Sequence, residues 1–422
     1  MKALVSPFRA EGSLPAQPSK SAAHRLLICA ALADRETDIG LSAWNADMEA
    51  TKACLTALGA GFDKTEESVR VRPIQGKPAG LPLLDCGESG STLRFLLPVT
   101  AALWGASLTG RGRLPERPLS DLTGQLAAHG VSVSGERLPL TVSGGLSGGR
   151  YSLPGNVSSQ YFTGLMLAAP LVGEMTVGIR GRLESAGYIA MTREAMAAFG
   201  VKTAMTDDEI TVPGGQRYRS PGRLTAEGDW SGAAFPLALG ALAGPVTVQG
   251  LRMDSAQGDR RIVPLLERMG AKVSAQGGSV TVLRADRLSA LTEDVSGIPD
   301  MVPVLAALLM HAEGTSVLSG AGRLRLKESD RLESVRAMVN ALGGSAAIEG
   351  DSLMIRGCAA CPGGRVNGFG DHRIVMAAAV GASRCTGPSE IGDAEAVRKS
   401  YPSFWDDFTA LGGGIDVVGI RE

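Results

Sequence analysis

Aromatic residues, net charge and long apolar runs are all scarce in this sequence. Phe, Trp and Tyr make up 4% of the 422 residues, so an aromatic groove on which bases could stack is not expected. Acidic and basic residues number 43 and 42, and this balance argues against a nucleic acid or a membrane surface as partner. No apolar run reaches the roughly 18 residues of a membrane span, and the N-terminus lacks the apolar centre of a signal peptide. We therefore expect a cytoplasmic protein that binds anionic ligands, if any, through local clusters of charge.

Sequence signals for metals and nucleotides are also missing. There is no histidine cluster, no P-loop and no dinucleotide fingerprint. The six cysteines lie mostly in apolar surroundings, which is typical of reduced thiols in the core of a cytosolic protein. Cys358 and Cys361 form one CxxC pair, but no second pair with ligand spacing follows. We therefore expect no metal site.

Glycine, by contrast, is abundant and marks an internal repeat. Amphipathic segments that end in an apolar residue followed by Gly recur about every 70 residues, and six such units fill the chain. Each unit also holds a helix that is apolar nearly all round, which is typical of a buried helix. The repeating glycines are at positions 59, 130, 200, 270, 343 and 412. The residues expected to begin the buried helices are Ser21, Ser89, Ser158, Asp229, Asp300 and Asp371.

Short segments of alternating polarity between the helices predict strands, so the expected fold class is α/β. Three units per domain is the simplest division of six. Pro221, Gly222 and Gly228 indicate a domain boundary near Gly222 to Gly228. Helix N-termini carry partial positive charge, so six polar helix starts facing one interdomain cleft would form a site for anions.

Cations gather near several of these helix starts. The segment 18–25, PSKSAAHR, and the segment 111–117, RGRLPER, are basic, while 87–94, GESGSTLR, offers glycines and an arginine. The densest cluster, 323–331, RLRLKESDR, mixes cations with carboxylates. Each segment alone is explained equally well by a helix cap or a solvated charge run. Together they predict a cationic site in which carboxylates transfer protons beside bound anions.

Five strings in this sequence resemble the EPSP synthases, the 3-phosphoshikimate 1-carboxyvinyltransferases of the enolpyruvyl transferase family. They are PSKSAAHR, GNVSSQYFTGLMLAAP, LKESDRLES, GDHRIVMA and RKSYPSFW, and the similarity covers essentially the whole chain. The resemblance implies the enolpyruvyl transferase fold, a two-domain inside-out α/β barrel with three units per domain. It implies a domain I of residues 1–17 plus 227–422, a domain II of residues 18–226, and an active-site cleft between them.

The resemblance also implies an activity. The enolpyruvyl group of phosphoenolpyruvate would pass to the 5-hydroxyl of shikimate 3-phosphate through a tetrahedral intermediate, releasing phosphate, in the shikimate pathway of aromatic amino-acid biosynthesis. Both substrates are small molecules, and no metal or organic cofactor is expected. A cytoplasmic monomer without nucleic-acid or membrane partners is expected.

The functional residues of the family carry over onto matching positions. Asp300 would be the base toward the attacking hydroxyl, and the proton donor would be Glu328, Lys20 or Lys399. The residues expected to bind shikimate 3-phosphate are Lys20, Ser21, Arg25, Ser158, Ser159, Gln160, Ser185, Tyr188, Asp300 and Lys327. Those expected to bind phosphoenolpyruvate are Lys20, Gly90, Arg117, Gln160, Arg331, Arg373 and Lys399.

Two positions depart from the family pattern, and two other functions were weighed. Glu88 and Arg323 each stand where the family often has Asn. One alternative is the sister enzyme that acts on UDP-N-acetylglucosamine, which carries a loop Cys near 111–118, whereas this chain has no Cys between Cys86 and Cys358. The other alternative is a non-catalytic anion-binding scaffold, against which the carboxylates among the cations argue.

Overall fold

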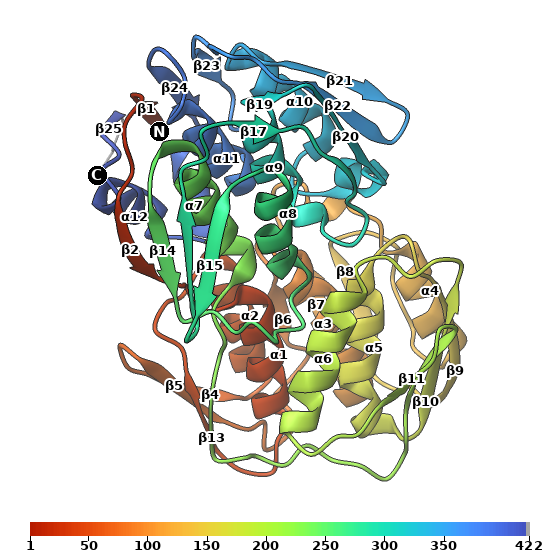
Figure 1. Cartoon of the computed structure of the whole chain (residues 1–422). Helices are drawn as coiled ribbons and strands as arrows, with labels where there is room; N and C mark the ends of the chain where they lie inside the picture. Colours follow the sequence, from red (N-terminus) through yellow and green to blue (C-terminus); the bar gives the residue numbers. More distant parts are fainter. Residues whose placement is uncertain (419–422) are drawn as a thin grey trace. The chain divides into compact units, whose positions relative to one another are not determined.

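The computed structural model describes residues 1–418, and the chain divides into two compact units (Figure 1). The terminal unit combines Met1–Ser19 with the chain from Glu227 onward, and the middle unit spans Lys20–Ala226. Each unit mixes α-helices with small β-sheets, which confirms the predicted α/β class. Within residues 1–418, no helix has the length and apolar character needed to cross a membrane.

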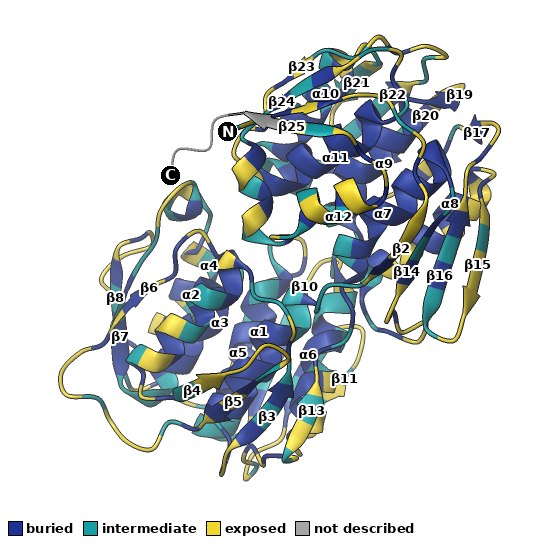
Figure 2. Ribbon diagram, turned by 90° about the vertical axis from the view of Figure 1, so that its left-hand side faces the viewer, coloured by how far each residue is buried: buried dark blue, intermediate teal, exposed yellow. Residues whose placement is uncertain are grey.

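The middle unit alternates largely buried inner helices with outer helices along the chain. Helix α3 packs against α5, α6 packs against both α1 and α5, and α2 packs against α1 and α3. The inner helices are mostly dark blue in Figure 2, as their nearly continuous apolar sequences predict. The inner helices are α1 (Lys20–Ala31), α3 (Gly90–Leu103) and α5 (Ser159–Val172), and the outer ones are α2 (Ala46–Ala57), α4 (Ser120–Ala128) and α6 (Ala186–Ala198).

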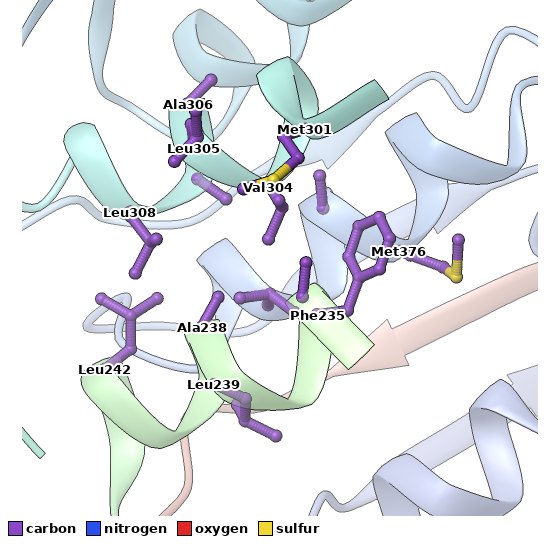
Figure 3. Packing of buried hydrophobic residues seen from close by; sticks show 14 of the residues in the cluster. Phe235, Ala238, Leu239, Leu242, Met301, Val304, Leu305, Ala306, Leu308 and Met376 are labelled. Atoms are coloured by element: carbon purple, nitrogen blue, oxygen red, sulfur yellow. The ribbon is translucent and has the colours of Figure 1, made fainter. Parts of the chain in front are cut away.

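The terminal unit has the same alternation. Every residue of the inner helices α9 and α11 is buried. Figure 3 shows Phe235 and Leu242 of α7 directed toward Val304 and Leu308 of α9, with Met376 of α11 beside them. The inner helices are α7 (Trp230–Ala243), α9 (Val302–Leu309) and α11 (His372–Ala382), and the others are α8 (Ile262–Arg268), α10 (Arg331–Ala341) and α12 (Phe404–Ala410).

One strand between each inner helix and the next outer helix has the same kind of neighbours. Strands β3, β7, β10, β14, β20 and β24 each pair with one parallel and one antiparallel strand. The middle unit has sheets β13-β3-β5-β4, β6-β7-β8 and β11-β12-β10-β9. The terminal unit has sheets β15-β16-β14-β2, β18-β20-β22-β21 and β23-β24-β1-β25, and the pair β17-β19.

The strand bounds of the middle unit are β3 (Thr37–Gly40), β4 (Gly61–Lys64), β5 (Ser68–Arg72), β6 (Leu83–Asp85), β7 (Gly105–Thr109), β8 (Leu140–Ser143), β9 (Gly149–Pro154), β10 (Met175–Arg180), β11 (Ala204–Met205), β12 (Glu209–Val212) and β13 (Arg223–Thr225). Those of the terminal unit are β1 (Lys2–Val5), β2 (Gly12–Pro15), β14 (Val246–Gln249), β15 (Lys272–Gln276), β16 (Ser279–Leu283), β17 (Leu288–Ser289), β18 (Thr292–Asp294), β19 (Ala312–Glu313), β20 (Thr315–Ser319), β21 (Ser345–Glu349), β22 (Ser352–Arg356), β23 (Arg365–Val366), β24 (Ser389–Gly392) and β25 (Ile415–Val418).

The helix ends follow the glycine period. Each of the six repeating glycines comes just after the end of an even-numbered helix, α2, α4, α6, α8, α10 or α12. Each has a positive φ, between 79° and 104°. This left-handed backbone at a helix C-terminus favours glycine, since other residues pay a steric cost there.

The helix starts agree with the sequence in most cases. The N-caps of α3, α5, α7 and α11 are the four residues predicted, Ser89, Ser158, Asp229 and Asp371. Ser21, by contrast, is the second residue of α1. Asp300 is also not a cap: it lies inside the 3-10 turn η3 (Pro299–Met301) that precedes α9.

Candidate active site

The first candidate site residues lie at the start of α1 in the middle unit. Lys20 is the first helical residue, and its Nζ lies 2.9 Å from Oδ2 of Asp47 on α2. Both side chains are mostly buried, at 16% and 8% exposed. Ser21 follows, and its carbonyl accepts a 2.6 Å hydrogen bond from Nη1 of Arg25. The helix therefore presents one paired cation and one buried cation within two turns.

Arg25 is a buried cation whose guanidinium is surrounded by neutral groups. Its Nε donates to Oγ1 of Thr192 at 2.8 Å, its Nη2 donates to the carbonyl of Tyr188 at 2.9 Å, and the group lies 4.9 Å from the ring centroid of Phe95. Burial lowers the pKa of Arg25 to about 10, so it stays charged at neutral pH. Within residues 1–418 no carboxylate pairs with it. A buried charge without a counter-ion is costly, and a bound anion would compensate it.

Ser185 and Tyr188 reach the same place from α6. Ser185 is the N-cap residue of α6, is buried, and has a left-handed backbone with φ of 57°. A non-glycine residue in this conformation is strained, and such strain is frequent at functional sites. Tyr188 lies one turn into the helix and its carbonyl holds Arg25. The two predicted residues thus lie beside the start of α1.

Gly90 allows two arginines to approach the start of α3. A Cβ atom at this position would lie 2.6 Å from Nη1 of Arg94 and 2.7 Å from Nη1 of Arg117. Arg117 follows the 3-10 turn η1 (Leu114–Glu116). The first backbone N–H groups of a helix can donate hydrogen bonds to an anion. The start of α3 therefore places two guanidinium groups beside such donors.

The start of α5 joins this cluster through Gln160. Its Oε1 accepts from Nη1 of Arg94 at 3.2 Å, and its Nε2 donates to Oγ of Ser91 at 3.0 Å. Ser158 caps the helix by accepting from the backbone N–H of Gln160, and Ser159 is buried next to it. The contacts of the middle unit therefore join the predicted residues in two groups, one of Ser21, Arg25 and Tyr188 and one of Gly90, Arg117, Ser158 and Gln160 around Arg94.

The terminal unit holds a second cluster, centred on Asp300. Its carboxylate lies 3.2 Å from Nζ of Lys327, 2.8 Å from Nη1 of Arg331 and 3.7 Å from Nη2 of Arg373. Arg373 also donates to the carbonyl of Asp300 at 3.1 Å. Burial alone would raise the pKa of Asp300, but Arg373, Lys327 and Arg331 together hold it well below its usual value.

Arg331 is 1% exposed and binds three carboxylates at once. Besides Asp300, it contacts Oδ2 of Asp371 at 2.9 Å through Nε and Oε2 of Glu328 at 2.6 Å through Nη2. Burial would lower its pKa, but the carboxylates of Asp371, Glu328 and Asp300 raise it above the usual value. Lys327 behaves differently, because burial outweighs the nearby Asp300 and lowers its pKa to about 8. Arg331 therefore stays charged, while Lys327 titrates at about pH 8.

The remaining predicted positions lie around these clusters. Lys399 ends the 3-10 turn η5 (Ala394–Lys399), which packs against α11, the helix that carries Arg373. Arg323 lies in the turn η4 (Gly322–Leu326) just before Lys327. Glu88 is exposed beside Gly112, and a Cβ at residue 112 would lie 2.8 Å from its carboxyl carbon. Of the two departures, Glu88 is exposed, whereas Arg323 lies close enough to Lys327 for its charge to lower the pKa of that lysine.

Three carboxylates of the clusters were not among the predicted site residues. Asp47 holds Lys20, Asp371 holds Arg331 and caps α11, and Asp259 accepts a short hydrogen bond from Ser231. The position of Asp371 at a helix start was a signal for it. Asp47 and Asp259 stand in ordinary polar surroundings in the sequence, and only folding places them beside their partners.

Asp259 predicts a pH effect on stability. Burial, then the charges of Asp300 and Asp229, raise its pKa to about 6 against the pull of Arg373. A carboxyl group whose pKa is higher in the folded than in the unfolded protein stabilises the fold at pH values below its pKa in the unfolded chain. This contribution is lost as the pH rises through the folded-state pKa of about 6. Asp259→Asn keeps a neutral side chain, so its urea midpoint relative to the natural protein should be higher at pH 7.5 than at pH 4.5. An equal difference at the two pH values would show that Asp259 does not titrate between them.

The part of the chain that the structure describes has no group of three or more His, Cys, Asp or Glu side chains placed to hold a metal ion. The thiols of Cys358 and Cys361 are free, and Cys361 is buried with its Sγ 3.7 Å from the carbonyl of Met310. Burial raises the pKa of Cys361 above its usual range, which is typical of an unreactive core thiol.

Comparison with known proteins identifies the family. A family model described as EPSP synthase (3-phosphoshikimate 1-carboxyvinyltransferase) matches residues 6–408. The chain is 40% identical over 418 residues to a 3-phosphoshikimate 1-carboxyvinyltransferase of Clostridium kluyveri, covering 98% of this chain and 97% of the relative. A relative of the same name from Clostridium beijerinckii is 36% identical over 432 residues, covering 99% of each chain.

A solved structure shows the fold. The EPSP synthase of Acinetobacter baumannii has a TM-score of 0.82 to this chain at 24% identity, covering 99% of this chain and 100% of that one. The predicted enolpyruvyl transferase fold is thereby confirmed, and so is the predicted family. The chain belongs to the EPSP synthase family.

Proposed function

We infer that this protein is a 3-phosphoshikimate 1-carboxyvinyltransferase of the shikimate pathway, which leads to the aromatic amino acids. It transfers the enolpyruvyl group of phosphoenolpyruvate to the 5-hydroxyl of shikimate 3-phosphate, giving 5-enolpyruvylshikimate 3-phosphate and phosphate. The observation that carries this inference is the family match over residues 6–408, together with curated relatives of that name at up to 40% identity.

The charges of the two clusters fit these substrates. Both substrates are small phosphorylated anions, and phosphoenolpyruvate adds a carboxylate. Arg25, Arg117 and Arg373 supply guanidinium groups, which suit phosphate and carboxylate because they donate two parallel hydrogen bonds. The uncharged donors Ser158 and Gln160 suit phosphate oxygens and hydroxyls. We propose that the residues predicted from the sequence for each substrate bind it.

Asp300 is proposed as the base toward the 5-hydroxyl. Arg373, Lys327 and Arg331 hold the pKa of Asp300 low, which makes its carboxylate a weak base as long as no substrate anion binds these cations. Anionic substrates that bind the same cations would weaken this effect and raise the basicity of Asp300. The carboxylate would thus become an effective base only when both substrates are present.

The proton donor to the methylene carbon is proposed among Glu328, Lys20 and Lys399. Glu328 is 15% exposed and held by Arg331 at 2.6 Å, which favours its charged form. Nζ of Lys20 lies 2.9 Å from Oδ2 of Asp47. A carboxylate must first gain a proton to act as donor, whereas a lysine already carries one, so we propose Lys20 ahead of Glu328.

The arrangement of the protein in the cell and in solution remains predicted. The predicted domain limits, 1–17 plus 227–422 and 18–226, and the active-site cleft between the domains stay predictions. We propose a cytoplasmic monomer that acts without a metal or an organic cofactor and without nucleic-acid or membrane partners.

The test is phosphate release by the purified protein. We expect phosphate from phosphoenolpyruvate only when shikimate 3-phosphate is added, measured by a coupled phosphate assay. UDP-N-acetylglucosamine serves as the matched second acceptor. Release with that acceptor instead would assign the chain to the sister activity, and no release with either acceptor would favour a non-catalytic anion-binding protein.

A further inference from the structure

A buried chain of hydrogen bonds crosses the middle unit from α1 to the start of α3. Nδ1 of His24 lies 2.7 Å from Oγ1 of Thr51, which lies 2.6 Å from Oγ1 of Thr92, which lies 2.7 Å from Oγ of Ser89. All four side chains are fully buried. They come from α1, α2, α3 and the cap of α3, so the chain joins the three elements that carry Lys20, Asp47 and Gly90.

The donors in this chain can be assigned. Ser89 Oγ accepts from Thr92 Oγ1 and also from the backbone N–H of Thr92, so it caps α3. Because the single hydroxyl proton of Thr92 is donated to Ser89, the Thr92 oxygen accepts from the hydroxyl of Thr51. The Thr51 oxygen in turn accepts from Nδ1 of His24. His24 then carries its proton on Nδ1, and its Nε2 is a lone pair. Nε2 is buried without a hydrogen-bond partner in the described residues, and an orphaned acceptor costs less than an orphaned N–H.

Of the four residues in this unit that the proposed function assigns to phosphoenolpyruvate, Thr92 is linked to two, Gly90 and Lys20. Through Ser89 it fixes the turn that precedes Gly90. Its Oγ1 also lies 3.4 Å from the carbonyl oxygen of Asp47, a second and more distant acceptor for the same proton, and Asp47 pairs with Lys20. By contrast, Arg25 donates to the hydroxyl of Thr192, which is not part of this chain of hydrogen bonds.

We propose that His24, Thr51 and Thr92 are positioning residues that place Gly90, which is assigned to phosphoenolpyruvate alone, and leave Arg25, Ser185 and Tyr188, which are assigned to shikimate 3-phosphate alone, unaffected. The proposal rests on the proposed function. It treats the three side chains as a rigid link and not as participants in proton transfer. Burial supports this role, since it lowers the pKa of His24 to about 3 and so keeps the ring neutral at working pH.

The experiment compares Thr92→Val with Thr100→Val. Both threonines are fully buried on α3, but the hydroxyl of Thr100 bonds only the carbonyl of Leu97 in the same helix. We expect Thr92→Val to raise the KM for phosphoenolpyruvate about 10-fold, the effect of one lost buried hydrogen bond, with the affinity for shikimate 3-phosphate within about twofold. Thr100→Val should leave both within about twofold, and Thr92→Ser should restore most of the KM.

Each outcome decides one point. Equal KM values for phosphoenolpyruvate in the two valine variants, or a parallel loss of shikimate 3-phosphate affinity, would overturn the positioning role of Thr92 while the proposed function stands. A natural protein that releases no phosphate would overturn the proposed function and this inference with it. Nitrogen-15 spectra of His24 test the link if Thr92→Val does not fold. The link is supported if the natural protein carries the proton on Nδ1 of His24 and Thr51→Val loses it or shares it between the two ring nitrogens. A proton on Nε2 in the natural protein overturns the link.

Discussion

Asp300→Asn is expected to lower kcat by about 100-fold or more, as is typical for loss of a general acid or base. Asn has nearly the shape of Asp and keeps an oxygen for Lys327 and Arg331, which lie 3.2 Å and 2.8 Å from the native carboxylate. It cannot accept the proton of the 5-hydroxyl. The measurement is steady-state phosphate release, with shikimate 3-phosphate binding followed separately by calorimetry.

The binding measurement separates catalysis from structure. We expect the affinity of Asp300→Asn for shikimate 3-phosphate to stay within a few fold, because Arg25 and its neighbours are untouched. The control is Asp254→Asn, an exposed carboxylate paired with Arg252 in the same unit, which should keep full turnover. Turnover of Asp300→Asn near that of the natural protein would remove Asp300 from the mechanism.

Arg331→Met is expected to destabilise the protein by about 3–5 kcal/mol, the usual cost of removing one partner of a buried ion pair. The guanidinium is 1% exposed and neutralises Asp300, Glu328 and Asp371, with Asp371 itself fully buried. Without it, the three carboxylates repel one another in a poorly solvated place. Urea unfolding at neutral pH measures the loss.

The matched control for this prediction lies on the same helix. Arg336→Met removes an exposed pair with Glu333, whose side chains are 41% and 47% exposed, and should cost about 0.5 kcal/mol or less. Met and Arg have similar helix propensity, so the helix itself is little affected in either variant. A loss for Arg331→Met no larger than for Arg336→Met would show that the buried carboxylates do not depend on this guanidinium.

Much of the fold was predictable because its signals are local. A glycine after an amphipathic helix and a polar residue before an apolar one depend on a few neighbouring residues, and Gly59 and Ser158 are found in these roles. Asp300 shows where such reasoning stops. It lies inside a 3-10 turn that begins at Pro299, and its carboxylate pairs with cations instead of capping a helix.

The candidate site was predictable only in part. The basic and serine-rich segments indicated anion binding, and the resemblance named the residues, but the sequence did not show which carboxylate pairs with which cation. Asp47 is 27 residues from Lys20, and Asp371 is 40 residues from Arg331. Such pairs carry no periodic signal, so the lowered pKa values of Asp300 and Lys327 follow from tertiary structure alone.

The sequence by itself determined the α/β class, the glycine period, the buried helices and the family, because each depends on local pattern or on direct similarity. The scarcity of aromatics and of net charge agreed with small anionic ligands. Only the tertiary structure decided that Arg25 is a buried cation among neutral groups, that Arg331 binds three carboxylates, and that four hydroxyl and imidazole groups join α1 to the start of α3. The physical reason is that burial sets the energy of a charge or a hydrogen bond, and burial exists only after the helices have packed.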